Sequence, residues 1–255
     1  MRDAGLLDFA WPLPPGVRAA FTTRRGGASA APWDSFNLGA HVGDAPQAVA
    51  TNRARLRSLL ALPSEPVWLS QVHGNAVLDL EARAASRGTP VADGAVARAP
   101  GGVCAIMVAD CLPVLFASRD GTRIGAAHAG WRGLAAGVLE NTVAALEAPA
   151  AGLTAWLGPA ISQPNFEVGD EVRAVFVDAD AGAAPHFSSN TRGRWQADLA
   201  GLARRRLAAL GIRDVHGGGW CTVADRERFF SHRRDGQQSG NTGRMAALIW
   251  HTAGQ

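Results

Sequence analysis

Apolar residues fall in short blocks separated by glycine, proline and acidic residues along the whole chain. Short apolar or alternating blocks that end at such turn formers are typical of β-strands. A turn at Arg119-Asp-Gly121 predicts a hairpin, and a second hairpin is expected to join residues 67–72 to 77–80. The pattern predicts strands over residues 17–24, 67–72, 77–80, 103–109, 114–117, 123–127, 155–161 and 245–250.

Longer segments repeat apolar residues at helical spacing. Asp44 and Pro46 are suited to the start of a helix, and Gly211 is suited to the position just after one. The clearest helix follows Gly130, where one face carries Leu134, Val138, Thr142 and Leu146. The pattern predicts the other helices over residues 44–60, 170–176 and 198–210.

Helices and strands alternate irregularly, and the intervening segments 81–90 and 178–194 are polar and predict loops. Several predicted hairpins interrupt the alternation, which favours an α/β (α+β) fold with mixed β-sheets over a purely parallel sheet. The 255 residues suffice for one large domain or two small ones, and no linker-like stretch divides them.

Composition and charge narrow the class of protein. Apolar residues make up 47% of the chain and charged residues 18%, as expected for a globular enzyme. The formal charge is +3, but basic and acidic residues are interleaved, so we expect no nucleic-acid partner. No stretch approaches the roughly 18 apolar residues of a membrane span, and no signal peptide is evident. We therefore predict a cytoplasmic protein without a membrane partner.

Two absences exclude specific chemistry. The chain contains neither lysine nor tyrosine, which excludes a Schiff-base lysine, a phosphate-loop lysine and a tyrosine acid. Any anionic group of a substrate must then be bound by arginine, histidine or backbone amides. The run Arg204-Arg-Arg206 is expected to be a solvated helix face. Three cysteines, an odd number, argue against a disulfide framework and suit a reducing compartment.

Three soft-metal ligands stand where strand-like runs meet turns: His73 in Gln71-Val-His-Gly74, Cys111 in Asp110-Cys-Leu-Pro113, and His128 in His128-Ala-Gly-Trp-Arg-Gly133. Taken singly, Cys111 would be read as a small buried hydrophobe and each histidine as an ordinary hydrogen-bonded residue. Their contexts favour a shared catalytic metal site instead. Two imidazoles and a thiolate are a donor set for zinc with one position left open.

Motifs along nearly the whole chain resemble the YfiH-type family. Members of that family are described as polyphenol oxidase or laccase-domain proteins, as purine nucleoside phosphorylases and as a peptidoglycan editing factor. One departure is His232, which stands where relatives have tyrosine. The matching motifs are Thr22-Thr-Arg-Arg-Gly-Gly27, Asn37-Leu-Gly39, Gln71-Val-His-Gly74, Ala92-Asp-Gly94, Ala109-Asp-Cys-Leu-Pro-Val114, His128-Ala-Gly-Trp-Arg-Gly133, Leu157-Gly-Pro159 and Phe229-Phe-Ser-His-Arg-Arg-Asp235.

The resemblance implies one YfiH-like catalytic domain over residues 1–255, folded as a layered α/β sandwich similar to a cysteine-hydrolase group. It implies phosphorolysis of adenosine, inosine or methylthioadenosine, with purine nucleoside and phosphate as the partners, and adenosine deamination as a further activity. The competing description is a hydrolase that removes a misincorporated serine from a peptidoglycan precursor. The family's metal positions fall on His73, Cys111 and His128, with Zn²⁺ as the expected ion and Cu²⁺ as the alternative.

Roles for further residues complete the hypothesis. Asp93 is the candidate for carrying a proton beside the metal ligands His73, Cys111 and His128. Guanidinium groups bind phosphate oxygens in pairs, which makes the arginines of the matching motifs candidates for anion binding. The candidates for substrate binding are Arg24, Asn37, Gln71, Arg132 and Arg233.

Other functions use the same residues. A metal-free hydrolase would take Cys111 as nucleophile, His128 as base, and Arg132 or helix-terminal amides as the oxyanion site. A zinc-stabilised binding module would require a fourth ligand such as Cys104 or Cys221. Multicopper oxidation is disfavoured, because seven histidines are too few for a trinuclear cluster and a further copper. The sequence leaves the oligomeric state open between monomer and homodimer.

Overall fold

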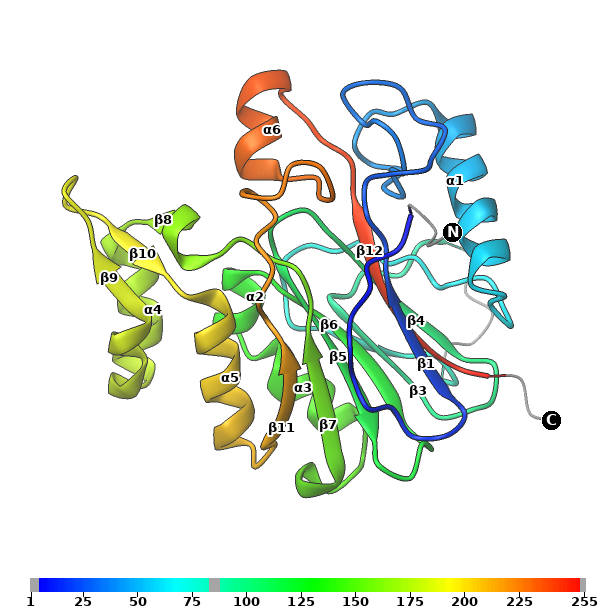
Figure 1. Ribbon diagram of the computed structural model, residues 1–255. Helices are drawn as coiled ribbons and strands as arrows, with labels where there is room; N and C mark the ends of the chain where they lie inside the picture. Colours follow the sequence, from blue (N-terminus) through cyan, green and yellow to red (C-terminus); the bar gives the residue numbers. More distant parts are fainter. Residues whose placement is uncertain (1–4, 83–87, 253–255) are drawn as a thin grey trace.

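The computed structural model describes residues 5–82 and 88–252 (Figure 1). Its helices are α1 (Pro46–Leu59), α2 (Trp131–Ala135), α3 (Val138–Ala145), α4 (Asp170–Ala179), α5 (Leu199–Ala209) and α6 (His232–Ser239), with 3-10 turns at Ala150–Gly152, Gln163–Asn165 and Ala181–His186. Its strands are β1 (Val17–Phe21), β2 (Val77–Asp79), β3 (Gly94–Ala97), β4 (Val103–Val108), β5 (Leu112–Ser118), β6 (Ile124–Ala129), β7 (Leu153–Leu157), β8 (Glu167–Val168), β9 (Phe187–Ser189), β10 (Trp195–Ala197), β11 (Asp214–Gly217) and β12 (Met245–His251).

The strands form three sheets. The largest has the order β11-β7-β5-β6-β3-β2, in which the two outer pairs are parallel and the inner pairs antiparallel. A second sheet, β1-β12-β4, is entirely antiparallel, as is the small sheet β8-β10-β9. The expected fold class, with mixed sheets, is confirmed.

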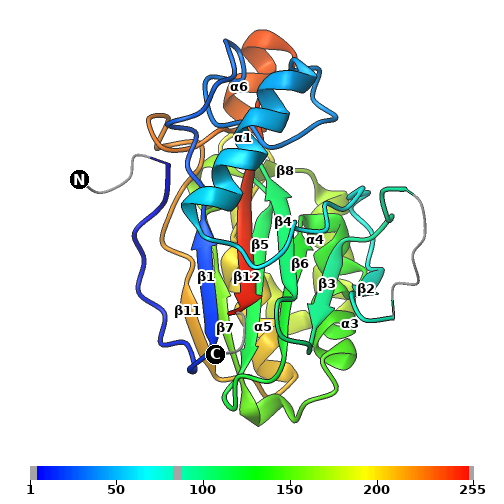
Figure 2. The ribbon, with the colours of Figure 1, turned by 90° about the vertical axis from the view of Figure 1, so that its right-hand side faces the viewer.

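The two larger sheets pack face to face between helices. Figure 1 shows α4 and α5 beyond the six-stranded sheet and α1 beyond the three-stranded sheet. Side chains of β5 and β6 on one face pack with α3 and α5, and side chains on the other face pack with β1, β4 and β12. Both views place α1 and α6 at the same end of the sandwich (Figure 2).

Alternation along a buried strand explains the layers. Successive side chains of a strand point to opposite faces, so a strand buried on both faces is a continuous apolar run. In β4, Cys104 and Ile106 face the six-stranded sheet, whereas Val103 and Ala105 pack in the cluster that includes Leu56 of α1. Burying an aliphatic or aromatic side chain of this kind stabilises the fold by about 1.5–3 kcal/mol.

The segment before His73 differs from its prediction. Residues 67–72 form no strand, apart from a single bridge between Ser70 and Val91, and β2 pairs in parallel with β3 instead of in a hairpin. The reason lies in Gln71, whose side-chain amide exchanges two hydrogen bonds of 2.8 Å with the backbone of Met107. This side chain takes the place of a backbone ladder between the loop and β4.

The long helix predicted after Gly130 is interrupted. It divides into α2 and α3 at Gly137, which adopts the left-handed conformation with φ 91°. Glycine enters this region without the steric cost paid by other residues. The start of α1 is also shifted, because Ala45 is its N-cap and the Asp44 carboxylate accepts hydrogen bonds from Ser29 and Asn37 instead.

One of the two expected loops carries more structure than predicted. Residues 178–194 include a 3-10 turn and strand β9, while residues 83–87 of the other expected loop lie outside the described residues.

The arginine run on α5 is not simply solvated. Arg204 donates to the carbonyls of Val215 and Gly217, and Arg206 pairs with Glu140 at 2.8 Å. None of the helices in residues 5–82 and 88–252 could cross a bilayer.

Candidate metal centre

The three expected metal ligands come together where several elements end. His73 lies in the loop before β2, Cys111 directly precedes β5, and His128 lies near the end of β6. Strands β5 and β6 are antiparallel neighbours with Pro113 opposite His128, which brings Cys111 beside His128. One ligand atom from each of the three residues lies within 4.8 Å of the others, and Cys111 Sγ is 3.7 Å from His73 Nε2.

Asp93 holds both histidines of the centre. Its carboxylate is fully buried and accepts a 2.8 Å hydrogen bond from Nδ1 of His128. It also accepts the successive backbone N–H groups of Val72, His73 and Gly74 at 3.2, 2.9 and 2.7 Å. These bonds hold His73 in the left-handed region, at φ 62°. With Nδ1 of His128 engaged by Asp93, Nε2 is the nitrogen left for a metal, a common arrangement in which a carboxylate orients a histidine ligand.

The charges of the centre favour the metal-binding form of the thiol. Burial alone would raise the pKa of Cys111, but the charge of His128 and hydrogen bonds from His128 and His73 lower it to about 6. Burial opposes protonation of His128, whereas the Cys111 thiolate and Asp93 raise its pKa to about 9. A thiolate is the form of cysteine that binds a metal. Cys111 is therefore a thiolate at neutral pH, and a metal that bound here would displace the proton of His128.

The donor set fits zinc. Tetrahedral zinc with one sulfur and two nitrogen ligands separates its donor atoms by about 3.5 Å, close to the observed sulfur–nitrogen distance of 3.7 Å. Within residues 5–82 and 88–252, the other cysteines are not part of the cluster. Cys104 is fully buried in β4, and Cys221 accepts hydrogen bonds from Ser162 and Asn165. Three protein ligands are the pattern of catalytic zinc, whereas structural zinc has four.

Gly130 makes room for the centre. A Cβ at this position would lie 2.8 Å from Cys111 Sγ, which would have to shift, and 3.1 Å from Cδ2 of His73, which is a tight contact. The backbone of Gly130, at φ −59° and ψ 156°, is accessible to any residue, so an added methyl group would act only through these contacts.

Gly130→Ala should therefore weaken zinc binding while leaving the fold intact. We expect a loss of about 10-fold or more, comparable with the loss of a residue that supports a ligand. Competition with a chromophoric chelator measures the affinity, and thermal unfolding monitors the fold. Gly152→Ala is the matched control, because a Cβ there meets nothing within 4 Å. Equal zinc affinity in both variants would show that the tight contact is irrelevant to the metal.

A cavity of about 360 Å³ opens onto the ligands. Among the described residues, no carboxylate lines it. The sequence did not indicate three of the lining residues, Arg244, His41 and Met107, because none of them lies in a recognised motif. His41 closely follows the motif Asn37-Leu-Gly39. His232, the departure from the family motif, lines the cavity at the start of α6. The full lining is His41, Gln71, His73, Met107, Val108, Ala109, Cys111, His128, Arg132, His232 and Arg244.

Asp110 fastens the Cys111 turn to the start of α6. It is buried with φ 86°, and its carboxylate accepts hydrogen bonds from Thr222 Oγ1 at 2.5 Å and Ser231 Oγ at 3.0 Å. It also accepts the backbone N–H of Arg233 at 2.6 Å. A single carboxylate thus fixes the backbone on both sides of the cavity.

The candidates for substrate binding separate into two groups. Gln71 and Arg132 line the cavity, although the amide of Gln71 is occupied by Met107. Asn37, Arg24 and Arg233 do not line it. Arg233 donates to the carbonyls of Asn165 and Glu167 at 3.4 and 3.3 Å.

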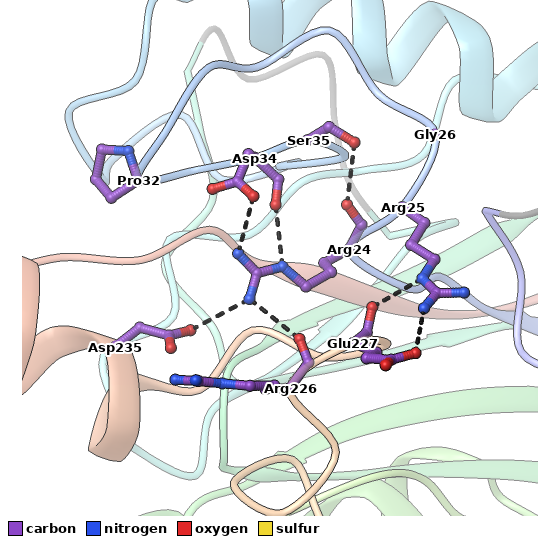
Figure 3. A pocket seen from close by; sticks show the side chains of 9 residues that line it. All are labelled: Arg24, Arg25, Gly26, Pro32, Asp34, Ser35, Arg226, Glu227 and Asp235. Atoms are coloured by element: carbon purple, nitrogen blue, oxygen red, sulfur yellow. Dashed lines mark hydrogen bonds and ion pairs between the residues drawn. The ribbon is translucent and has the colours of Figure 1, made fainter.

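Arg24 and Asn37 are engaged by other parts of the fold. Arg24 lies in a separate cavity of about 600 Å³, where it pairs with Asp34 and contacts the carbonyl of Arg226 (Figure 3). Its guanidinium also approaches Asp235 to 3.9 Å. Asn37 is fully buried, and its Oδ1 accepts the backbone N–H of Arg244 at 2.8 Å. Asn37 therefore acts on the cavity only by positioning Arg244.

Comparisons with known proteins identify relatives along nearly the whole chain. Residues 18–252 match the family model described as multi-copper polyphenol oxidoreductase laccase. A purine nucleoside phosphorylase of Pseudomonas aeruginosa is 54% identical over 241 residues, which cover 94% of this chain and 96% of that protein. Purine nucleoside phosphorylase YfiH of Escherichia coli is 52% identical over 242 residues, with 94% and 96% covered.

Solved structures show the same architecture. The crystal structure of a Neisseria meningitidis protein matches with a TM-score of 0.91 at 46% identity, over 98% of this chain and 100% of that one. The structure of YlmD from Geobacillus stearothermophilus matches with a TM-score of 0.86 at 32% identity, over 99% and 98%. Fold and site thus define a protein of the laccase-domain class. Within that class, the chain belongs to the YfiH-type family.

Proposed function

We propose that this chain is a zinc-dependent purine nucleoside phosphorylase that acts on adenosine, inosine and methylthioadenosine. The observation that carries the proposal is the cluster of His73, Cys111 and His128 at a cavity large enough for a small ligand. Relatives that are about half identical over nearly their whole length are named purine nucleoside phosphorylases. The three free cysteines suit the cytoplasm, where nucleosides are available.

The chemistry divides between the metal and the side chains of the cavity. Bound zinc would supply Lewis acidity next to the substrate. In phosphorolysis a phosphate oxygen forms a bond to C1′ while the C1′–N9 bond breaks. Its electron pair leaves with the purine, which takes up a proton. The protein must therefore hold an oxyanion near C1′ and stabilise the charge on the departing base.

Adenosine deamination is proposed as a second activity of the same cavity. Zinc deaminases combine a histidine and cysteine site with a carboxylate that moves protons. Here Asp93 is buried beneath the ligands with its oxygens hydrogen-bonded, so its role is to position His73 and His128. Proton transfer then falls to the imidazoles that line the cavity, His41 and His232.

Metal removal and reconstitution test the proposal. We expect chelated protein to lose phosphate-dependent release of hypoxanthine from inosine, and one equivalent of Zn²⁺ to restore it. Chromatography of base and pentose 1-phosphate measures the reaction, and metal content is read by mass spectrometry. Full activity in the metal-free protein would refute the metal dependence. Recovery with Cu²⁺ but not Zn²⁺ would change the identity of the ion.

A second candidate is a metal-free cysteine hydrolase that edits a peptidoglycan precursor by removing a misincorporated serine. The observation in its favour is the lowered pKa of Cys111 beside His128, which Asp93 orients, an arrangement found in cysteine hydrolases. The presence of His73 beside Cys111 fits this candidate less well, since a Cys–His dyad needs no second imidazole. Turnover of a serine-containing precursor by metal-free protein would favour this candidate.

A further inference from the structure

Positive charge dominates the cavity beside the metal ligands. Arg132 and Arg244 both line it, and no carboxylate lines it among the residues that the structure describes. The one anion at its wall is the Cys111 thiolate, whose charge is compensated when a divalent metal is bound. A concave site with this balance attracts an anion and holds it more strongly than an exposed surface would.

Arg244 is a partly buried arginine that forms no ion pair among the described residues, although Cys111 and Asp110 act on it by their charge. Its Nη1 donates to the carbonyls of Thr242 and Gly243 at 2.9 and 3.3 Å. Its Nε and Nη2 have no protein acceptor, and its guanidinium forms no ion pair, within residues 5–82 and 88–252. Several other partly buried arginines use their donors within the fold: Arg234 pairs with Asp235, and Arg204 and Arg233 donate to backbone carbonyls. Buried charges are normally paired, so free donors at a cavity wall indicate a ligand of opposite charge.

The position of Arg244 is fixed in advance. Asn37 accepts its backbone N–H at 2.8 Å, and Asn37 is itself held by a hydrogen bond to Asp44 at 2.8 Å. The two carbonyls that accept from Nη1 further restrict the guanidinium. A cation held in this way loses little conformational entropy when it binds a ligand, which increases its contribution to affinity.

Arg132 and His41 add donors to the same cavity. Arg132 extends from α2, directly after the metal-ligand strand, and its guanidinium stacks on Trp131 with 4.4 Å to the ring centroid. It makes no ion pair among the described residues. His41 lines the same cavity as Arg244. Burial, together with the positive charges of Arg244 and Arg53, lowers the pKa of His41. Its imidazole is therefore neutral at pH 7 and able to donate one hydrogen bond.

We propose that Arg244, assisted by Arg132 and His41, forms an oxyanion subsite that binds inorganic phosphate beside the metal centre. Arg244 presents two adjacent N–H donors, the fork that matches two oxygens of a tetrahedral oxyanion. The assignment rests on the proposed phosphorolysis for its role in turnover. It replaces Arg24 and Arg233, which the sequence had suggested, because the fold engages their guanidinium groups elsewhere.

Direct binding of inorganic phosphate to the zinc-loaded protein tests the subsite without reference to turnover. By isothermal titration calorimetry, Arg244→Gln should bind phosphate about 10- to 100-fold more weakly than the wild type, the effect of losing a charged bidentate contact. Arg132→Gln should show a smaller loss. Arg57→Gln, on the exposed face of α1 and without a side-chain hydrogen bond or ion pair among the described residues, is the matched control and should bind as the wild type does.

Kinetics then separate the subsite from the proposed function. In Arg244→Gln we expect the KM for phosphate to rise by a similar factor while zinc content and the KM for inosine stay near wild-type values. Equal phosphate affinity in wild type and Arg244→Gln, or no phosphate binding by the wild type, would overturn the subsite even if phosphorolysis is observed. Arg244-dependent phosphate binding without phosphorolysis would overturn the proposed reaction and leave the subsite. Arg132→Gln preserves the test if Arg244→Gln fails to fold.

Discussion

Cys111→Ala should abolish zinc binding and phosphate-dependent cleavage of inosine together. The residue is one of the three candidate ligands, and its thiolate would be the only anionic donor in the set. Loss of a residue that merely supports a ligand costs about 10- to 100-fold in metal affinity or activity, so loss of the ligand itself should exceed 100-fold. Zinc content by mass spectrometry and the rate of hypoxanthine release, measured on the same preparations, check the expectation.

The fold should survive this change, because Cys111 lies in a turn at the cavity and is only partly buried at the edge of an apolar cluster. Cys221→Ser is the matched control. Its thiol is engaged by Ser162 and Asn165 outside the metal cluster, so zinc and activity should be retained. A Cys111→Ala protein that keeps zinc and full turnover would refute the assigned centre. Loss of turnover with zinc retained would instead favour Cys111 as a nucleophile.

The three residues of the candidate metal centre could be selected from sequence because their chemistry is local. Each of His73, Cys111 and His128 marks the end of an apolar run, and few other residue types can bind a soft metal. The cluster distances agree with that expectation. The geometry that supports the ligands could not be identified, since Asp93 and Asp110 act through partners that are distant in sequence, such as His128 and Thr222.

Motif membership did not distinguish a ligand-binding arginine from a structural one. Arg24 and Arg233 lie in motifs shared with the family, but their guanidinium groups bind carboxylates or carbonyls of the chain. Arg244 lies outside those motifs and reaches the cavity. Only the three-dimensional structure shows which arginine keeps donors free at the cavity, because the contacts of a guanidinium depend on residues that folding brings together.

Some features of the fold could likewise be predicted from the sequence and others could not. The apolar runs predicted β4 and β5 close to their observed bounds, since a strand buried on both faces has no other pattern. Their assignment to different sheets was not accessible, because periodicity does not specify a strand's neighbours. The break at Gly137 was also missed, since a lone glycine within a helical pattern is often tolerated.

Asp93→Asn should weaken zinc binding by about 10- to 100-fold and destabilise the loop that carries His73. The carboxylate accepts four hydrogen bonds, three from backbone N–H groups and one from His128. An asparagine offers a single acceptor oxygen, and its NH₂ group would face N–H donors. We expect a loss of about 3 kcal/mol or more in the free energy of unfolding at neutral pH, since charged hydrogen bonds are lost and buried donors are left unpaired.

The pH dependence of this loss in unfolding free energy distinguishes the contribution of the carboxylate's charge from that of its packing. Burial raises the pKa of Asp93, but the hydrogen bonds from His128 and Gly74 outweigh it, so the pKa in the folded protein is lowered. A lowered pKa means that the ionised group stabilises the fold above the unfolded value of about 3.9 and that this stabilisation is lost as the pH falls through the folded value. The difference in the free energy of unfolding between wild type and Asp93→Asn should therefore be largest at pH 7 and decrease as the pH falls. Asp178→Asn, an exposed carboxylate without a described partner, should show no gap at either pH. A difference in unfolding free energy that does not depend on pH would mean that Asp93 acts by packing alone. Unchanged zinc affinity in Asp93→Asn would show that Asp93 does not position the two histidines for a metal.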